Sequence, residues 1–307
     1  MINQKVDKFM SNSKSITAVV VTYNRLKMLQ ECIPALLTQS QQLNKLVVVN
    51  NHSNDGTEEY LMDIDDKRLL VFNLDDNLGG AGGFEFGIKQ AVEHTDSDYI
   101  WFMDDDTIPT ENASTNLLIA AHKLNDEFGF LCSNVRWTDG SSTNIPKVHD
   151  KWPEKVLYNL IRVTEATFVS VMVKRESIIE FGLPGADFVI WGDDTEYTVR
   201  LSQKSASYFV EDSIVQHKTV NNLANDTLEE IAVNRINRYY YMYRNLIYIT
   251  RKYQGSVKMW KRVLGNAKDY FKVLFKAHDN RFKRSNAILK GTLSGLIFHP
   301  SIKFPKV

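Results

Sequence analysis

Residues 97–106 have the sequence SDYIWFMDDD, in which an apolar run ends in three adjacent aspartates. Residues 98–103 predict a buried β-strand. Three neighbouring carboxylates repel one another, and a divalent cation removes the repulsion because it is then the largest local charge. Hard oxygen ligands favour Mg²⁺ or Mn²⁺. Asp104, Asp105 and Asp106 are therefore candidate contacts of a metal site. The alternative is a polar loop in which Asp106 caps a helix that opens at Pro109.

Strands and helices alternate around this strand. Strands are predicted at residues 16–21, 46–50 and 69–74, and helices at residues 26–38, shortly after residue 56, and at 79–93. The alternation predicts an α/β fold with a doubly wound, mostly parallel sheet. Ligands of such sheets bind beyond the carboxyl ends of the strands. Thr22, Asn50, Asn77 and Asp104 each follow a predicted strand, so we expect them to share one site.

The rest of the chain predicts a mixed segment followed by helices. Between residues 112 and 215 we expect strands at 166–174 and 208–211, and helices at 176–181 and 193–204. We therefore predict two regions, a sheet-containing one at residues 1–217 and a basic helical one at residues 218–307.

The C-terminal region carries a strong positive charge. Residues 234–307 contain 17 Lys and Arg but only 2 Asp and Glu, whereas the whole chain contains 37 of each kind. A basic tail on an acidic body predicts an anionic partner. Nucleic acid is not expected, because no nucleic-acid-binding motif accompanies the charge.

This region also predicts an amphipathic helix. Lys258, Arg262, Lys272 and Lys276 fall largely on one side. The apolar residues recur at three- and four-residue spacing on the other side, and they are Val257, Trp260, Leu264, Ala267, Phe271 and Leu274. Either the helix packs on the rest of the protein and exposes its basic face to solvent, or it lies on an anionic membrane surface.

Composition is that of a folded protein, with 307 residues, 43% hydrophobic and 24% charged. Residues 1–15 lack an apolar core, so we expect no secretory signal. No stretch approaches the roughly 18 apolar residues that span a bilayer. Cys32 and Cys132 form no metal motif, which predicts reduced, buried thiols in a cytosolic protein.

Three polar loops follow the first three strands. The sequence TYNR at residues 22–25 can contact a base or a phosphate, or simply lead into a helix. The sequence NNHSNDGT at residues 50–57 can contact the edge of a nucleobase, or form an Asx-type turn followed by a helix cap. The sequence NLGGAGGF at residues 77–84 offers backbone N–H groups at a helix start. It lacks the Lys-Ser/Thr ending of a P-loop, and it follows the third strand, so a dinucleotide fingerprint is not indicated.

A second acidic cluster, Asp193, Asp194 and Glu196, begins a predicted helix. A cap needs one carboxylate, and here three occur within four residues, so one of them can act as a general base near the metal. Glu196 can instead form a helix ion pair with Arg200. His217 follows the last predicted strand, where it is either structural or a third metal ligand.

These segments together resemble family 2 glycosyltransferases of the GT-A fold. The matching pieces are VVVTYNR, VVVNNHSNDGT, NLGGAGGF, FMDDD and WGDDTEYTVR with a later His; they occur in the family's order over about residues 16–217. NLGGAGGF, FMDDD and WGDDTEY are most similar to bacterial galactofuranosyltransferases and next to rhamnosyltransferases. The sequence NRYYYMYRN at residues 237–245 is also similar to that branch. Many relatives have Asp at the position of Asn50, so the resemblance supplies no base-binding carboxylate there.

The resemblance implies an inverting, Mn²⁺- or Mg²⁺-dependent transfer of a sugar from a nucleotide-diphosphate donor. Asp104, Asp106 and His217 would hold the metal, and Asp194 would be the base, with Asp193 as the alternative. The nucleotide would contact Thr22, Asn24, Arg25, Asn51, Asp55, Asn77, Gly80, Asp104 and Asp105.

The expected donor is UDP-galactofuranose, with dTDP-rhamnose as the alternative. The expected acceptor is a glycan or a polyprenyl-linked glycan of a cell-wall polysaccharide. The protein would then be cytoplasmic and peripheral on the inner face of the membrane, and homo-oligomers are compatible with this.

Two other classes of protein are alternatives to a glycosyltransferase. A nucleotidyltransferase usually needs a glycine-rich phosphate loop after the first strand, which TYNR does not provide. A non-catalytic sugar-nucleotide-binding protein does not need the two intact acidic clusters.

Overall fold

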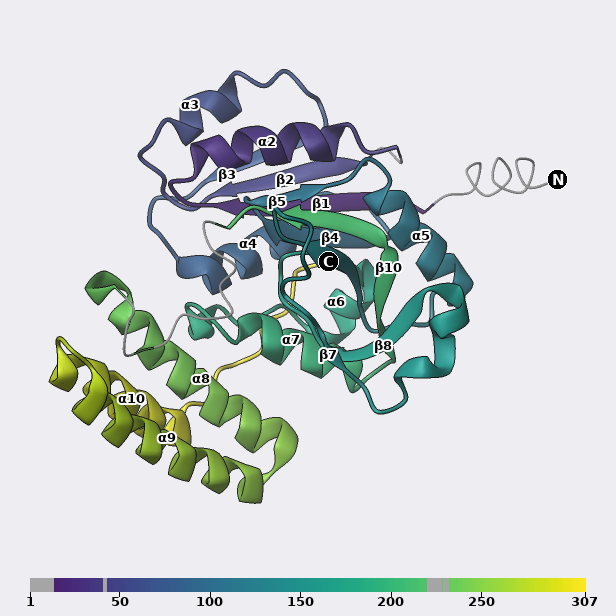
Figure 1. Cartoon of the computed structure of the whole chain (residues 1–307). Coiled ribbons are helices and arrows are strands. Elements are labelled where there is room, and N and C mark those ends of the chain that lie inside the picture. Colours follow the sequence, from purple (N-terminus) through teal and green to yellow (C-terminus); the bar gives the residue numbers. More distant parts are fainter. Residues whose placement is uncertain (1–13, 41–42, 220–227, 229–231) are drawn as a thin grey trace.

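The computed structural model describes residues 14–40, 43–219, 228 and 232–307 (Figure 1). Most of residues 1–15, for which no secretory signal is predicted, lie outside the described residues. The first half alternates strands and helices as the sequence predicts. Its elements are β1 (Ile16–Thr22), α2 (Leu26–Leu37), β2 (Lys45–Asn50), α3 (Thr57–Met62), β3 (Leu69–Asn73), α4 (Gly79–His94) and β4 (Tyr99–Asp104).

The second half contains more strands than expected. Its elements are β5 (Thr107–Pro109), α5 (Ala113–Lys123), β6 (Leu131–Arg136), β7 (Lys147–Val148), η1 (Trp152–Tyr158), β8 (Leu160–Glu165), β9 (Val171–Lys174), α6 (Arg175–Phe181), η2 (Ala186–Phe188), α7 (Asp193–Ser202) and β10 (Ser207–His217). The strand predicted at 166–174 is wrong in its first half, because residues 166–170 form a loop. Phe168 and Val169 are buried in that loop, and this gives it the apolar sequence of a strand.

The helix expected to open at Pro109 is also absent from the described residues near that position. Thr107–Pro109 forms β5, which pairs antiparallel with the end of β10, and α5 begins only at Ala113. Asp106 therefore caps no helix, and the capping alternative is wrong. β10 is longer than the predicted 208–211, so His217 ends this strand and does not follow it. A register shift between Val210 and Ile214 breaks its alternation and hides its second half in the sequence.

The ten strands of the described residues form one sheet, in the order β3-β2-β1-β4-β9-β6-β10-β8-β7, with β5 paired to β10. β3, β2, β1 and β4 are parallel, and β10 is parallel to β6. β9 runs antiparallel to both β4 and β6. The order in the sheet places β1 between β2 and β4, so the carboxyl ends of these three parallel strands meet at one edge. The α/β fold class is confirmed, and the antiparallel pairs come from the second half.

Helices cover both faces of the sheet (Figure 1). α2 and α5 cover one face, where Leu29 and Leu117 belong to one apolar cluster with Trp101. α4 and α7 cover the other face, where Ile88 and Tyr197 cluster with other apolar side chains. β1 is buried along its whole length, which is why its sequence is rich in apolar and β-branched residues and does not alternate with charged ones.

In the described part of the chain after β10, three α-helices lie beside α4 and α7 (Figure 1). They are α8 (Ile236–Gln254), α9 (Ser256–Lys276) and α10 (Arg281–Ile297), preceded by η4 (Val233–Arg235). Glu196 of α7 contacts α8, because it accepts a hydrogen bond from Lys252 Nζ at 3.0 Å. Within α7, Glu196 also accepts a hydrogen bond from Arg200 Nη2 at 2.9 Å. The predicted Glu196–Arg200 ion pair is thus confirmed. In the part of the chain that the structure describes, no helix combines the length and apolar character needed to cross a bilayer.

Candidate active site

The acidic triplet and the loop after β1 form one polar cluster. Thr22 Oγ1 donates to Asp105 Oδ2 at 2.7 Å. Arg25 Nη1 donates to Asp106 Oδ2 at 2.5 Å and to Asp105 Oδ1 at 3.3 Å. The adjacent parallel strands β1 and β4 bring these residues together, although about 80 residues separate them in sequence.

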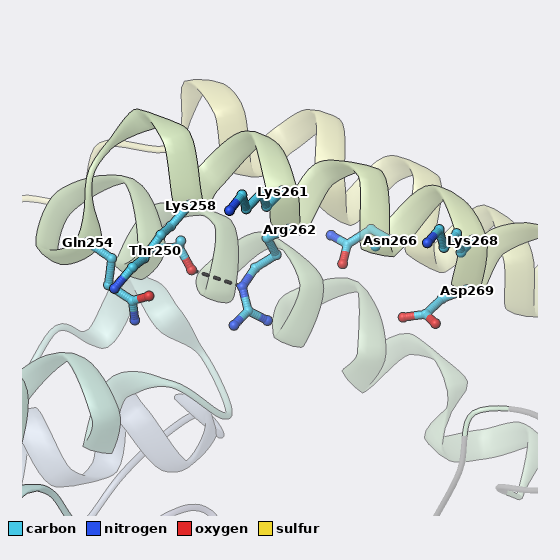
Figure 2. Close-up of a pocket in the computed structure, with 9 residues that line it drawn as sticks. Thr250, Gln254, Lys258, Lys261, Arg262, Asn266, Lys268 and Asp269 are labelled. Atoms are coloured by element: carbon cyan, nitrogen blue, oxygen red, sulfur yellow. Dashed lines mark hydrogen bonds between the residues drawn. The ribbon is translucent and has the colours of Figure 1, made fainter.

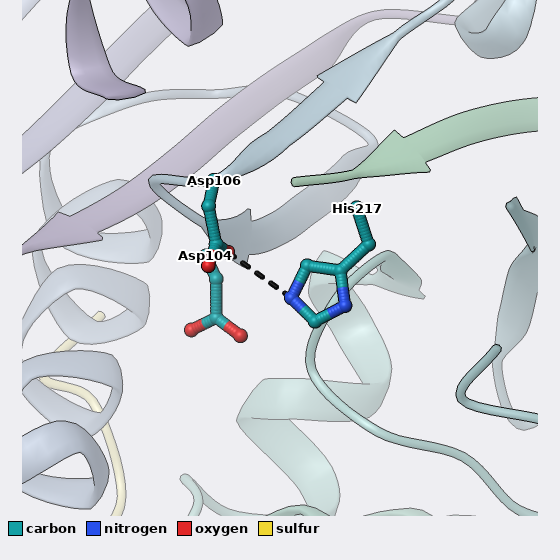
Figure 3. Close-up of side chains that lie close together, drawn as sticks. All are labelled: Asp104, Asp106 and His217. Carbon is teal, nitrogen blue, oxygen red and sulfur yellow. Dashed lines mark ion pairs between the residues drawn. The ribbon is translucent and has the colours of Figure 1, made fainter. Parts of the chain in front are cut away.

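Asp104, Asp106 and His217 converge as predicted (Figure 3). Their ligand atoms all lie within 4.8 Å of one another. His217 Nε2 lies 3.1 Å from Asp106 Oδ1, a buried oxygen that receives no well-aligned hydrogen bond among the described residues. His217 Nδ1 lies 2.9 Å from Asn144 Oδ1 and donates to it, which fixes the ring with Nε2 toward the carboxylate. An imidazole nitrogen and carboxylate oxygens are ligands of divalent metals, so these three residues fit a divalent metal.

The charges of the triplet fit the same conclusion. Burial raises the pKa of Asp104 well above its ordinary value, and its two neighbouring carboxylates raise it further. Burial likewise raises the pKa of Asp105 to about 6. Burial opposes ionisation of Asp106 too, but contacts with His217 and Arg25 hold its pKa below the ordinary value. Arg25 is a single positive charge against three carboxylates, so a further cation would stabilise the cluster.

The second acidic cluster lies at the first turn of α7. Burial and then Asp194 raise the pKa of Asp193 to about 8, and burial raises the pKa of Asp194. Asp194 Oδ1 accepts a hydrogen bond from Thr195 N at 2.7 Å. Asp193 also contributes to the raised pKa of Asp104, so the two acidic clusters act on each other electrostatically.

The backbone that leads into α7 is strained. Val189 has φ 66° and Trp191 has φ 59°, a left-handed region that branched and bulky side chains rarely adopt. Ala81 N, in the first turn of α4, donates to Val189 O at 3.2 Å. Gly79 has φ 73°, and a Cβ there would lie 2.5 Å from Val189 O, so this position requires glycine.

Two residues of α8 hold this strained segment from the other side. Asn245, which has no exposed surface, donates from Nδ2 to the carbonyl oxygens of residues 188, 190 and 191 at 3.0, 3.2 and 2.6 Å. Arg244 Nη2 donates to Asp187 O at 2.6 Å. We call Arg244 and Asn245 the carbonyl clamp. Sequence reasoning missed its role because the bonded carbonyls lie more than 50 residues away and depend only on tertiary structure.

The predicted nucleotide contacts in the loop after β3 are held by a residue of the loop after β2. Asn51 is buried, and its Nδ2 donates to Asn77 Oδ1 (3.1 Å) and to Gly79 O (3.0 Å). Asn77 Oδ1 also accepts a hydrogen bond from Gly79 N at 2.8 Å. A Cβ at Gly80 would meet nothing within 4 Å, so space is open beside this backbone.

The loop after β2 forms the turn that the sequence allowed, but α3, the helix that follows it, has no side-chain cap. Asn50 Oδ1 accepts from the backbone of residue 53 at 3.0 Å, which closes the turn. Asp55 Oδ2 accepts from Leu26 N at 2.9 Å and thereby satisfies a free N–H at the start of α2. Asn24 Oδ1 accepts from Asn54 N at 2.8 Å. These bonds tie the loops after β1 and β2 together at the same edge of the sheet.

Comparison with protein-family models gives one match. The family described as glycosyl transferase family 2 matches residues 17–181, from β1 to the end of α6.

Two bacterial relatives are similar over parts of the chain. The galactofuranosyltransferase GlfT1 of Mycolicibacterium smegmatis is 30% identical over 127 residues, which cover 40% of this chain and 41% of GlfT1. This match thus spans about two-fifths of that relative's length. TuaG, a Bacillus subtilis glycosyltransferase proposed to act in teichuronic acid biosynthesis, is 23% identical over 222 residues, which cover 69% of this chain and 82% of TuaG.

One solved structure is similar over almost the whole chain. The crystal structure of GalNAc-T7 with UDP, GalNAc and Mn²⁺ has a TM-score of 0.62 at 14% identity, and the match covers 96% of this chain and 56% of that chain. At this identity the likeness shows the fold alone, and it agrees with the predicted fold class.

Proposed function

Since the chain belongs to glycosyl transferase family 2, whose model matches more than half of it, we propose that this glycosyltransferase transfers a sugar with inversion from a nucleotide-diphosphate donor to an acceptor hydroxyl. The observation that carries the proposal is the site of Asp104, Asp106 and His217, in which a buried carboxylate oxygen of Asp106 lies 3.1 Å from His217 Nε2. Family membership and the GT-A fold leave the nucleotidyltransferase and non-catalytic alternatives without support.

The residues have distinct roles in this proposal. Mn²⁺ or Mg²⁺ bound to Asp104, Asp106 and His217 would neutralise the diphosphate as it leaves. Asp194, or alternatively Asp193, accepts the proton of the acceptor hydroxyl. The hydroxyl oxygen then bonds to the anomeric carbon from the face opposite the breaking bond to the diphosphate, which inverts the configuration.

The nucleotide would lie along the edge formed by the loops after β1, β2, β3 and β4. The shared edge and the open space beside Gly80 support this placement. The proposed contacts are Thr22, Asn24, Arg25, Asn51, Asp55, Asn77, Gly80, Asp104 and Asp105. Among these, Thr22 and Arg25 already bond the acidic triplet, so they can orient it toward the diphosphate.

We propose UDP-galactofuranose as the donor, with dTDP-rhamnose as the alternative. The similarity to GlfT1 supports galactofuranose, and the fold neighbour was solved with UDP and Mn²⁺. The acceptor would be a lipid-linked or cell-surface precursor of a wall polysaccharide, in line with the proposed role of TuaG. Residues 1–217 would form the nucleotide-sugar-binding and catalytic domain, and the basic helical region 218–307 would bring it to the inner face of the membrane.

Calorimetric titration with UDP and with dTDP, each with and without Mn²⁺, tests this proposal. We expect UDP to bind more tightly than dTDP, and only when Mn²⁺ is present, because its diphosphate and the acidic triplet need a cation between them. Preference for dTDP would move the proposal to rhamnosyl transfer. Binding of neither nucleotide would contradict a nucleotide-sugar donor.

The carbonyl clamp gives a separate prediction. Replacing Asn245 with leucine keeps the side-chain volume but removes the donors that hold residues 188–191 in a strained conformation. Relaxation of that strain should move the start of α7 and lower kcat by about tenfold. The Kd for UDP should change less than kcat, because among the loops with proposed nucleotide contacts only the loop after β3 is shown in contact with residue 189. Steady-state kinetics and calorimetry measure the two quantities.

Asn266→Leu is a matched control. Asn266 is also a buried asparagine of the C-terminal helices, and its Nδ2 donates to Thr292 Oγ1 of α10. It should lower thermal stability but leave kcat unchanged. Equal kcat values for wild type and Asn245→Leu would show that the clamp only supports the fold.

A further inference from the structure

The outer surface of α9 and α10 exposes nine large apolar side chains. Each of them is between 45% and 81% exposed, and they are Val257, Trp260, Leu264, Phe271, Phe275, Phe282, Leu289, Leu293 and Ile297. α9 packs on its neighbours through Met259, Asn266 and Val273, so the apolar face predicted from its sequence is not the face that packs. Exposed apolar side chains gathered in this way mark an interaction surface.

Contacts of α9 show which way this face points. Arg262 Nε donates to Thr250 Oγ1 of α8 at 2.9 Å, and Asn266 Nδ2 donates to Thr292 Oγ1 of α10 at 2.9 Å. With 3.6 residues per turn, Trp260 and the other exposed apolar residues of α9 lie opposite Arg262. The apolar face of α9 therefore points away from α8 and borders the side that contacts α10.

The exposed apolar side chains of α10 also lie next to the contact between α9 and α10. α10 packs closely on α8 through Gly291 and Gly295, where an added Cβ would lie within 2.5 Å and 2.7 Å of carbonyl oxygens of α8. Thr292 faces α9, and Leu289 and Leu293 follow on the side of Thr292 away from both glycines. The exposed apolar residues of the two helices thus form one surface opposite α8, which we call the apolar strip.

Basic residues border the apolar strip. On α9 the residues that lie next to the strip around the helix are Lys261 and Lys268, and on α10 they are Lys283 and Lys290. All four are exposed. The same side of α9 lines a groove of about 500 Å³ against α8 (Figure 2), whose basic residues are Lys258, Lys261, Arg262 and Lys268. Residues 256–297 contain ten Lys and Arg but only two acidic residues, so this surface is complementary to an anionic partner.

We propose that the apolar strip is a membrane-binding surface that inserts into the interface of an anionic bilayer, with the bordering lysines at the lipid phosphates. Helices that lie in the interface combine an apolar face carrying Trp, Phe and Leu with a lysine-rich polar face. A second copy of the chain fits the strip less well, because a two-fold contact would bring the lysines of one copy close to those of the other. The inference rests on the proposed function, since it places the active site at the leaflet that carries the lipid-linked acceptor.

Vesicle co-sedimentation of the full chain tests the surface. Vesicles of phosphatidylcholine alone are compared with vesicles that also contain phosphatidylglycerol. We expect the wild type to bind the anionic vesicles at low salt and to be released by high salt. The variant Trp260→Ser/Phe271→Ser should bind at least about tenfold more weakly, because it loses two inserted aromatic side chains. The variant Lys261→Glu/Lys268→Glu should lose the preference for anionic vesicles.

Matched variants elsewhere on the surface serve as controls. Ile145→Ser/Leu157→Ser changes two exposed apolar residues of the sheet-containing region, and Lys67→Glu/Lys151→Glu changes two exposed lysines there. Both should bind vesicles like the wild type. The proposal is overturned if the wild type stays in the supernatant, or if the strip variants bind as well as the controls. It is also overturned if light scattering shows a dimer that Trp260→Ser/Phe271→Ser converts to a monomer while vesicles have no effect.

The vesicle result is independent of the nucleotide result. Trp260→Ser/Phe271→Ser should keep the Mn²⁺-dependent UDP affinity of the wild type in the absence of lipid, because the strip lies on helices away from the nucleotide loops. Vesicle binding by a wild type that binds no nucleotide would contradict the proposed function and leave the membrane surface standing.

Discussion

Replacement of Asp194 by asparagine should lower the rate of sugar transfer by about 10²-fold or more, with the Kd of the donor unchanged. The asparagine has almost the same shape, and its amide oxygen can still accept the hydrogen bond from Thr195 N. The variant loses only the group that accepts the proton of the acceptor hydroxyl. Single-turnover rates with saturating donor and acceptor measure the loss, and titration with UDP measures binding.

The pH dependence of transfer gives a second readout of the same residue. Burial raises the pKa of Asp194 above its ordinary value. A general base works only when it is deprotonated, so the rate should fall as the pH drops through this raised pKa. The fall should therefore lie at higher pH than an exposed aspartate would give. Asp194→Asn should show a low rate without this acid limb.

Asp193→Asn is the matched comparison, because Asp193 is the neighbouring carboxylate on the same turn. Burial raises its pKa to about 8, so it is largely protonated at neutral pH and is a poor base there. We expect a smaller loss of transfer than for Asp194→Asn. A large loss in Asp193→Asn with normal turnover in Asp194→Asn would assign the base to Asp193. Normal turnover in both variants would remove the base from α7.

The parallel half of the sheet was predictable because each of its strands has a local signal. β1 and β4 are buried on both faces and therefore carry runs of apolar and β-branched residues without charged residues before the strand end. The antiparallel half has no such signal. Residues 166–170 are apolar because they pack as a loop, and β10 contains exposed Glu211 and Asp212 at a register shift. Tertiary packing determines these segments, so a local pattern cannot separate strand from loop there.

The candidate site likewise has residues that the sequence predicts and residues that only the folded structure shows. Asp104, Asp106 and His217 were predictable as a group because each ends or follows a strand, and the sheet brings strand ends together. Asn144, which fixes the ring of His217, lies 73 residues away from it in a segment of irregular structure. Asn245 acts on carbonyl groups, whose positions no side-chain pattern reports. Supporting residues of this kind follow from the folded structure only.

The amphipathic pattern of α9 shows a further limit. Its sequence predicts one apolar face and one basic face. In one alternative the apolar face packs on the rest of the protein, and in the other it lies on a membrane surface. The structure shows three faces, because Asn266 and Val273 pack on α8 and α10 while Trp260 and Phe271 remain exposed. Met259, Asn266 and Val273 provide the packing, and most of the large apolar residues of α9 stay exposed.

Replacement of Asp106 by alanine should abolish the Mn²⁺ dependence of UDP binding. Asp106 contributes both the unbonded oxygen that faces His217 and the oxygen that accepts from Arg25. Loss of a direct ligand should cost at least as much as loss of a supporting residue, so the affinity for UDP in Mn²⁺ should fall by about 10- to 100-fold or more. Calorimetric titration with UDP, with and without Mn²⁺, measures this, and transfer should fall in parallel because the leaving diphosphate is no longer neutralised.

The alanine variant also removes a buried carboxylate that Arg25 contacts, so a fold defect has to be separated from loss of the metal site. Asp106→Asn keeps the side-chain volume and an oxygen that can accept from Arg25, but it removes the negative charge that holds a cation. It should fold like the wild type by circular dichroism and still lose the Mn²⁺ dependence of UDP binding. Asp76→Ala, at an exposed position in the loop after β3, should leave both properties unchanged. If Asp106→Asn bound UDP with the wild-type response to Mn²⁺, the metal would have to lie elsewhere, and the unbonded oxygen of Asp106 would then be explained by a protonated His217.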